Sequence, residues 1–294
     1  MSDAVLETVG LGYRYPDGRA ALTDLSLRIR RGERVALLGA NGSGKTTLLL
    51  NLLGLLTPTS GEIRAFGEPL GRRGTDLKRL RTRVGLVFQN PDSQLLSASV
   101  AEDVSFGPMN LGLEREEVRS RVEGALAAVG MSEHAEIPAH ALSFGQKKRV
   151  CIAGVLAMRP EVLLLDEPTA GLDARAIEEL LAVLAGLHAE GMTVVLSTHD
   201  IDLAYAWADR AEVLDRGRSV ESCVAADFAE AFPTFVRHGL ANPRVADVWA
   251  AATKAGLTRS LDGAVPRTHA DLLAALGQTP TPGLRAVTDI EEAS

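Results

Sequence analysis

Residues 35–47 decide the fold of this chain: they read Val35-Ala36-Leu37-Leu38-Gly39-Ala40-Asn41-Gly42-Ser43-Gly44-Lys45-Thr46-Thr47, an apolar strand that breaks into a glycine-rich loop and opens a helix. The loop matches the pattern G-x-x-x-x-G-K-[ST], from Gly39 to Thr46. Glycines let successive backbone N–H groups point at one anion, and the helix start adds the positive end of its dipole. The stretch therefore predicts a cradle for phosphate groups.

A nucleoside triphosphate, ATP, is the ligand that such a loop predicts. Lys45 can neutralise phosphate charge, and the Thr46 hydroxyl can ligate Mg²⁺. We expect the nucleotide to be held by Gly39, Asn41, Gly42, Ser43, Gly44, Lys45, Thr46 and Thr47.

Composition narrows the class of protein. The chain has 294 residues, of which 46% are hydrophobic, enough for one large domain plus an appendage. Its formal net charge of −7 argues against a nucleic-acid binder. The two cysteines have no metal-ligand spacing, which favours a reducing compartment. No apolar stretch reaches the roughly 18–20 residues that span a bilayer, so any work at a membrane requires a partner.

Hydrophobic patterning predicts an α/β fold. Residues 5–9 and 25–29 alternate as half-buried antiparallel strands do, and a turn from Tyr13 to Gly18 is expected between them. Continuous apolar runs at 84–88, 161–166 and 193–197 are separated by helical segments. Such runs are typical of parallel strands buried on both faces. A P-loop nucleotide-hydrolase core with a parallel sheet, preceded by a small antiparallel β subdomain, is the predicted architecture.

Polar residues end three of these strands. Asp166 and Glu167 follow one apolar run, and two adjacent acids repel each other unless a cation lies beside them. We interpret Asp166 as a Mg²⁺ partner and Glu167 as the base that deprotonates the attacking water. His199 follows the next strand, where it can hydrogen-bond the γ-phosphate. Gln89 ends the strand at 84–88, at the sheet edge where ligands bind in open α/β folds.

Taken together, these motifs resemble the ATP-binding cassette family over residues 5–221. The other motifs that carry the resemblance are the signature Leu142-Ser143-Phe144-Gly145-Gln146 and the turn residue Asp173. The resemblance implies that Tyr15 stacks on adenine and that Gln89 senses Mg²⁺ and water. It also implies a head-to-tail dimer with a second such ATPase, in which Ser143, Gly145, Gln146 and Asp173 help to bind the opposite protomer's ATP. Phe144 departs from the family pattern, which has glycine there.

A narrower resemblance points to energy-coupling-factor importers of the cobalt and nickel type. It rests on residues 87–94, 103–113 and 146–150. It implies an ATPase on the cytoplasmic face of the membrane, peripheral to a transmembrane coupling component and a separate substrate-binding membrane component. The solute would be a divalent metal ion, cobalt or nickel, or a vitamin. In that group, residues 90–94 line a groove for a helix of the coupling component, with Asp92 and Gln94 expected to face it.

Two other functions compete with this one. The first is the ATPase of an ordinary ABC importer or of an exporter, which the 90–94 and 103–113 phrases argue against. The second is a soluble cassette protein acting on nucleic acid or ribosomes. This chain has one motif set and no sustained heptads, so we expect no nucleic-acid partner.

The motifs end near residue 221, which suggests a boundary. We expect a nucleotide-binding domain over residues 1–222, with a helical subdomain at about 92–158, and a helical extension over 223–294. Helices are predicted at 225–232, 243–255 and 268–276, and a disordered tail near 279–282. The stripe with Trp249 on the second of these either packs on its own domain or forms a dimer contact.

Overall fold

The computed structural model describes residues 3–71, 73–257 and 265–277. Its strands are β1 (Ala4–Arg14), β2 (Ala20–Arg30), β3 (Arg34–Leu38), β4 (Ser60–Ala65), β5 (Glu68–Pro69), β6 (Val84–Val87), β7 (Val162–Asp166), β8 (Thr193–Thr198), β9 (Arg210–Asp215) and β10 (Arg218–Val224). Its α-helices are α1 (Lys45–Leu52), α2 (Gly74–Arg83), α3 (Val100–Asn110), α4 (Arg115–Ala128), α5 (Phe144–Leu156), α6 (Ala174–Ala189), α7 (Ile201–Trp207), α8 (Phe228–Arg237), α9 (Arg244–Lys254) and α10 (His269–Ala275).

The larger sheet has the strand order β10-β9-β3-β8-β7-β6, and five of its strands run parallel. Only β10 is antiparallel, paired with β9. This confirms the predicted parallel sheet. Because β3, β8 and β7 are neighbours, their carboxyl ends bring the glycine-rich loop, His199 and the Asp166–Glu167 pair to one edge.

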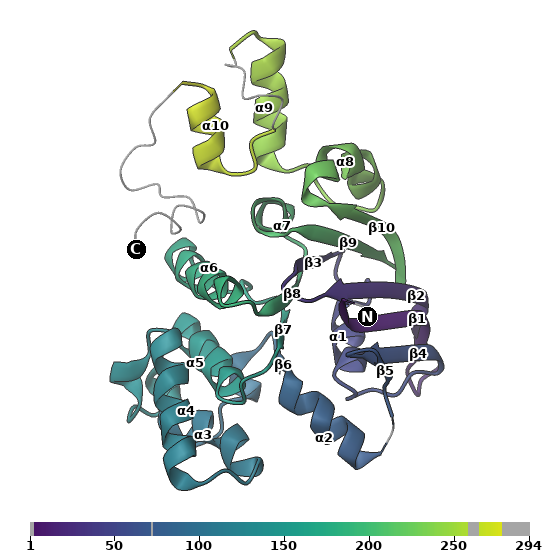
Figure 1. Cartoon of the computed structure of the whole chain (residues 1–294). Coiled ribbons are helices and arrows are strands. Elements are labelled where there is room, and N and C mark those ends of the chain that lie inside the picture. The colour runs from purple at the N-terminus through teal and green to yellow at the C-terminus, as the bar shows by residue number, and fades with distance from the viewer. Residues whose placement is uncertain (1–2, 72, 258–264, 278–294) are drawn as a thin grey trace.

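Two hydrophobic cores lie on the two faces of this sheet. Alternate residues along β3 enter different cores, with Leu38 in one and Leu37 in the other. Helices α6, α7 and α8 cover the first face, while α1 and the antiparallel sheet cover the second (Figure 1). Burial on both faces is why these strands read as unbroken apolar runs.

The smaller sheet is antiparallel, with the order β2-β1-β4-β5. Its first strand runs to Arg14, so Tyr13 belongs to the strand and not to the turn that we expected to begin there. Tyr13 is only 9% exposed and packs edge-on against Tyr15, with ring centroids 5.1 Å apart. The turn itself begins at Tyr15, whose carbonyl accepts a hydrogen bond from the Gly18 N–H.

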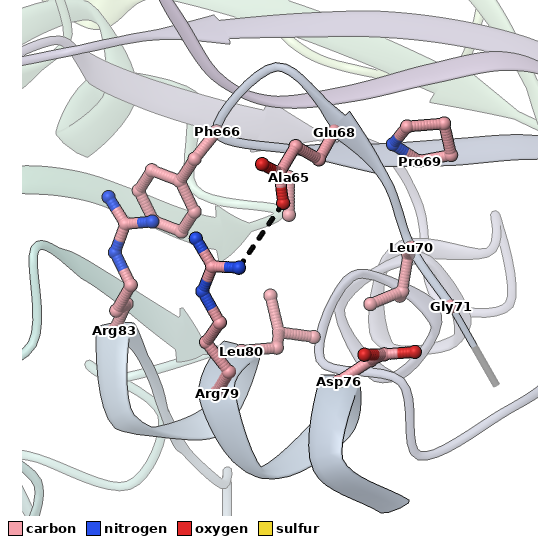
Figure 2. A pocket seen from close by; sticks show the side chains of 10 residues that line it. All are labelled: Ala65, Phe66, Glu68, Pro69, Leu70, Gly71, Asp76, Arg79, Leu80 and Arg83. Carbon is pink, nitrogen blue, oxygen red and sulfur yellow. Dashed lines mark hydrogen bonds and ion pairs between the residues drawn. The ribbon is translucent and has the colours of Figure 1, made fainter. Parts of the chain in front are cut away.

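The basic segment after β5 forms α2, and contacts of this helix join the smaller sheet to the larger one. Arg83 stacks on Phe66, 3.3 Å from guanidinium carbon to ring centroid, and pairs with Glu161, the residue before β7. This guanidinium is the main reason why the pKa of Glu161 lies below its usual value. Figure 2 shows the shallow pocket between α2 and the smaller sheet, with the ion pair of Arg79 and Glu68 across it.

The helical subdomain contains α3, α4 and α5, which pack together to one side of the sheets (Figure 1). At the other end of the chain, β10 crosses the expected boundary between residues 222 and 223, because it stays paired with β9 as far as Val224. The aromatic side chains of α8, including Phe228 and Phe235, are buried in the first core. Helix α9 adds Ala246 to the same core, and the predicted tail at 279–282 is outside the described residues.

Candidate functional site

The loop between β3 and α1 has the close backbone approach that its glycines predict. A Cβ on Gly39 would lie 2.4 Å from the Leu214 carbonyl oxygen and 2.5 Å from Ser43 Oγ. Gly44, with φ at 110°, precedes α1, and no side chain caps that helix start. The first N–H groups of α1 therefore have no capping side chain, as suits a site for an external anion.

A cluster of buried charges sits beside this loop. Lys45 Nζ donates a 2.6 Å hydrogen bond to the Gly39 carbonyl and lies 3.2 Å from Glu167 Oε1. His199 Nδ1 is 3.1 Å from Glu167 Oε2. Lys45 is 6% and Glu167 is 7% exposed, so their charges are poorly screened by water. Lys45 is thus a cation in direct contact with Glu167.

Asp166 is held by two hydroxyl groups. Thr46 Oγ1 donates to its Oδ2 at 2.7 Å, and Ser197 Oγ donates to its Oδ1 at 2.6 Å. Ser197 is a contact of the predicted site that the sequence analysis did not single out. It lies on β8 directly beside Asp166, and its polar side chain inside an apolar run was the available signal.

These residues fit a Mg²⁺ ion. Thr46 and Asp166 meet at the phosphate loop, and the buried Ser43 hydroxyl there has no hydrogen-bond partner. Among the described residues, no group of three or more His, Cys, Asp or Glu side chains could hold a metal alone. Mg²⁺ binds one or two protein side chains together with waters and substrate phosphates, and the Thr46 hydroxyl and Asp166 carboxylate supply two such oxygen ligands.

Most of the predicted nucleotide residues line one cavity of about 380 Å³. The cavity runs from Tyr15 along the loop to the Glu167 carboxylate, and it is lined among others by Asn41, Gly42, Ser43, Gly44, Lys45, Thr46, Thr47, Gln89, Glu167 and His199. The Tyr15 hydroxyl is 2.9 Å from Thr47 Oγ1, and the Arg19 guanidinium lies 4.9 Å from the ring centroid. Tyr15 is thus anchored at the cavity mouth.

The signature residues do not line this cavity. Ser143 and Gln146 form a capping box at the start of α5, and the Gln146 amide also contacts His134 at 3.1 Å. Gly145 faces α6, where an added Cβ would lie 3.1 Å from Ala176. Asp173 caps α6 by accepting the Ala176 N–H at 2.8 Å.

Phe144 fits the backbone here without glycine, because it is the first residue of the right-handed helix α5. Its ring packs over the turn before α6, against Gly171. Behind the ring lies Lys148, a second residue that sequence reasoning missed. Burial lowers the pKa of the Lys148 ammonium below its usual value, although Asp166 and Glu167 oppose the shift.

The segment from residue 90 to 94 differs in part from expectation. Asp92 is exposed and pairs with Lys147 at 2.7 Å. Gln94, however, does not face outward: its Oε1 accepts the Phe88 N–H at 2.8 Å, and its Nε2 donates to the Leu86 carbonyl at 3.4 Å. These two bonds satisfy the backbone at the end of β6, next to Gln89.

Comparison with known proteins places these features in one family. The model of the family described as ABC transporter matches residues 22–170, about half of the chain. The chain is 52% identical to the cobalt import ATP-binding protein CbiO of Rhodobacter capsulatus, over 83% of this chain and 87% of that protein. It is 47% identical to the energy-coupling factor transporter ATP-binding protein EcfA of Methanocaldococcus jannaschii, over 82% and 87%.

Two solved structures are also similar to this chain. The cbiO1 protein of Clostridium perfringens, part of the complex cbiONQ, superposes with a TM-score of 0.73 at 43% identity, covering 80% of this chain and 94% of that one. The cassette MJ0796, solved as a dimer bound to ADP and Pi, superposes with a TM-score of 0.68 at 30% identity, covering 75% and 98%.

Proposed function

This chain belongs to the ABC transporter family and is an ATPase coupled to transport, and from that premise we propose how its residues work and what it helps to import. It is the ATP-hydrolysing subunit of an importer of the energy-coupling-factor type. The observation that carries the mechanism is the position of Glu167, whose carboxylate lies between Lys45 and His199 at the end of the phosphate loop.

Glu167 is the general base. Its two carboxylate oxygens are fixed by Lys45 and His199, so its orientation toward a water beside the γ-phosphate is set before the reaction. When nucleotide binds, Lys45 contacts phosphate oxygens, and this exchange leaves Glu167 free to accept the proton of the attacking water. His199 holds the other carboxylate oxygen and donates to the γ-phosphate.

Thr46, Asp166 and Gln89 are the residues that would hold Mg²⁺. A bound ion would neutralise the negative charge that develops on the phosphate during transfer. The hydroxyl of Ser197 keeps Asp166 in place for that role. At the cavity mouth, the anchored ring of Tyr15 stacks on the base.

A second ATPase protomer, a copy of this chain or a paralogue, completes the site. Ser143, Gly145 and Gln146 lie at the start of α5 outside this chain's own cavity, as does Asp173 at the start of α6. In a head-to-tail dimer they would face the γ-phosphate of the ATP held by the partner, with the helix start of α5 supplying positive charge. The dimeric solved cassette supports this arrangement.

A transmembrane component docks on the helical subdomain. Leu96 is 84%, Phe106 is 68% and Met109 is 63% exposed. These three large apolar side chains lie on α3 and on the loop before it. That loop follows residues 90–94, whose Gln94 ties it to β6 beside Gln89. Nucleotide-driven movement at Gln89 therefore reaches this surface. Gln94 serves in this connection and not in the docking groove itself.

The protein acts at the cytoplasmic face of the membrane as a peripheral subunit. In the part of the chain that the structure describes, there is no helix with the length and apolarity needed to cross a bilayer. A separate membrane component binds the solute, which we propose to be a divalent cobalt or nickel ion, with a vitamin as the other candidate. The name of the Rhodobacter capsulatus relative, a cobalt import protein, favours the metal.

Glu167→Gln tests the mechanism. The variant should keep its affinity for ATP and slow hydrolysis by roughly 10²–10⁴, the usual contribution of a general base. It should also trap an ATP-bound dimer, which size-exclusion chromatography detects. Hydrolysis at the wild-type rate would show that Glu167 is not the base. Solute is tested separately, by uptake of labelled cobalt, nickel or vitamin into vesicles that hold the complete complex.

A further inference from the structure

Lys148 is a fully buried charged side chain, with 1% of its surface exposed. A buried ammonium is costly unless anions or hydrogen-bond acceptors surround it. Here the side chain reaches from α5 to the end of β7, where its Nζ lies 3.5 Å from the Glu167 carbonyl oxygen. Burial lowers the pKa of this ammonium, and the nearby Asp166 and Glu167 carboxylates oppose that shift. The lysine thus lies at the backbone of the proposed general base.

The backbone of Glu167 needs such support. Its φ is +45°, a left-handed conformation that residues other than glycine seldom adopt and that persists only when the surroundings hold it. On the N–H side it donates to Ser197 O at 3.1 Å and to Ser197 Oγ at 3.0 Å. On the carbonyl side the contacts are the Ala170 N–H at 3.2 Å and Lys148 Nζ. Lys148 is the only charged group that contacts this peptide in these hydrogen bonds.

Phe144 shields the lysine from water. The Lys148 ammonium lies 5.8 Å from the ring centroid, within the range of a cation–π contact. The same ring packs against Gly171, where an added Cβ would lie 3.2 Å from Phe144 Cε1, in the turn that leads from Glu167 to α6. The residue that departs from the usual glycine of the signature therefore covers the link between α5 and Glu167.

We propose that Lys148 is a positioning residue for ATP hydrolysis: its buried ammonium, covered by Phe144, holds the left-handed Glu167 backbone so that the carboxylate points into the nucleotide cavity. When Lys45 moves to phosphate, Lys148 keeps its contact with the Glu167 carbonyl. This inference rests on the proposed role of Glu167. It also gives the signature helix a direct contact with the base of its own protomer.

Lys148→Met is the main test, because methionine keeps the length and apolar volume and removes only the charge. In the purified protein we expect kcat for ATP to fall by about 10- to 100-fold, the effect of a slightly misplaced catalytic group, while KM and the affinity for a fluorescent ATP analogue stay within about 2-fold of wild type. The control is Lys78→Met on the exposed face of α2, which should leave both unchanged. A wild-type kcat in Lys148→Met would overturn the proposal.

A double variant separates positioning from general damage. If Lys148 acts through Glu167, Lys148→Met should slow single-turnover hydrolysis little further in a Glu167→Gln background. A full additional loss there, or a parallel loss of nucleotide affinity, would instead assign Lys148 to structure alone. If Glu167→Gln hydrolyses ATP at the wild-type rate, the proposed base fails, which is a different result from a silent Lys148→Met.

Thermal unfolding establishes that the variants fold. Should Lys148→Met lack a cooperative transition, the same kinetics are measured on Lys148→Gln, whose shorter neutral amide does not reach the Glu167 carbonyl. A fall in kcat at constant KM supports the proposal, and a wild-type kcat overturns it.

Discussion

Replacing Arg267 by alanine should release the segment that leads into α10 from the nucleotide-binding core. This side chain enters from the segment before α10 and binds the last turn of α7, where Nε donates to the Tyr205 carbonyl at 2.7 Å and Nη2 to the Ala208 carbonyl at 2.6 Å. Its guanidinium also lies 5.3 Å from the Phe228 ring centroid. The last carbonyls of a helix have no partner within the helix, so Arg267 supplies what α7 itself cannot.

The magnitude follows from these contacts. Two hydrogen bonds from a charged donor contribute about 1.5–3 kcal/mol each. Burial offsets part of this, since it lowers the pKa of Arg267 and so disfavours the charged form. A net loss of about 2–4 kcal/mol on Arg267→Ala is therefore expected. Because 1.36 kcal/mol corresponds to a factor of ten, amide hydrogens of α10 should exchange at least about 30-fold faster.

Hydrogen exchange followed by mass spectrometry measures this effect segment by segment. We expect faster exchange in α10 and in the last turn of α7, with β3 and β7 unchanged, because those strands lie in the sheet. Arg244→Ala is the matched control: its ion pair with Asp202, at 2.6 Å, involves a side chain that is 85% exposed, and such pairs contribute about 0–1 kcal/mol. Wild-type exchange of α10 in Arg267→Ala would refute the reasoning. So would a uniform rise that includes β3.

Two further predictions concern nucleotide recognition and coupling. Tyr15→Ala should weaken ATP and GTP binding alike by about 1–3 kcal/mol in a fluorescence titration, because stacking tolerates any base, and an unchanged affinity would leave Tyr15 with a packing role only. Leu96→Ser combined with Met109→Ser should lower solute uptake by the reconstituted complex and spare nucleotide affinity of the isolated protein, whereas Lys45→Ala, which removes a contact worth about 1.5–3 kcal/mol, should lower both. Full uptake by the double variant would exclude this docking surface.

Local chemistry in the sequence determined the kind of fold and most of the candidate site. A glycine-rich loop after an apolar strand commonly binds phosphate. Acids or a histidine at the ends of strands buried on both faces commonly belong to a ligand site. For that reason the parallel sheet and the proximity of His199 to Asp166 and Glu167 were predictable. Each depends on residue type and on the order of strands and helices along the chain.

Tertiary structure decided what depends on contacts between distant segments. The sequence shows Lys148 as one more residue in a basic run, and only the packing of α5 on β7 makes it a buried cation beside Glu167. Gln94 was expected to face the docking groove, but its hydrogen bonds to the backbone at the end of β6 hold its side chain inward. Likewise β10 continues past residue 222 because β9 lies beside it. The burial of a side chain and the positions of its hydrogen-bond partners depend on the whole fold. No short stretch of sequence is therefore enough to predict them.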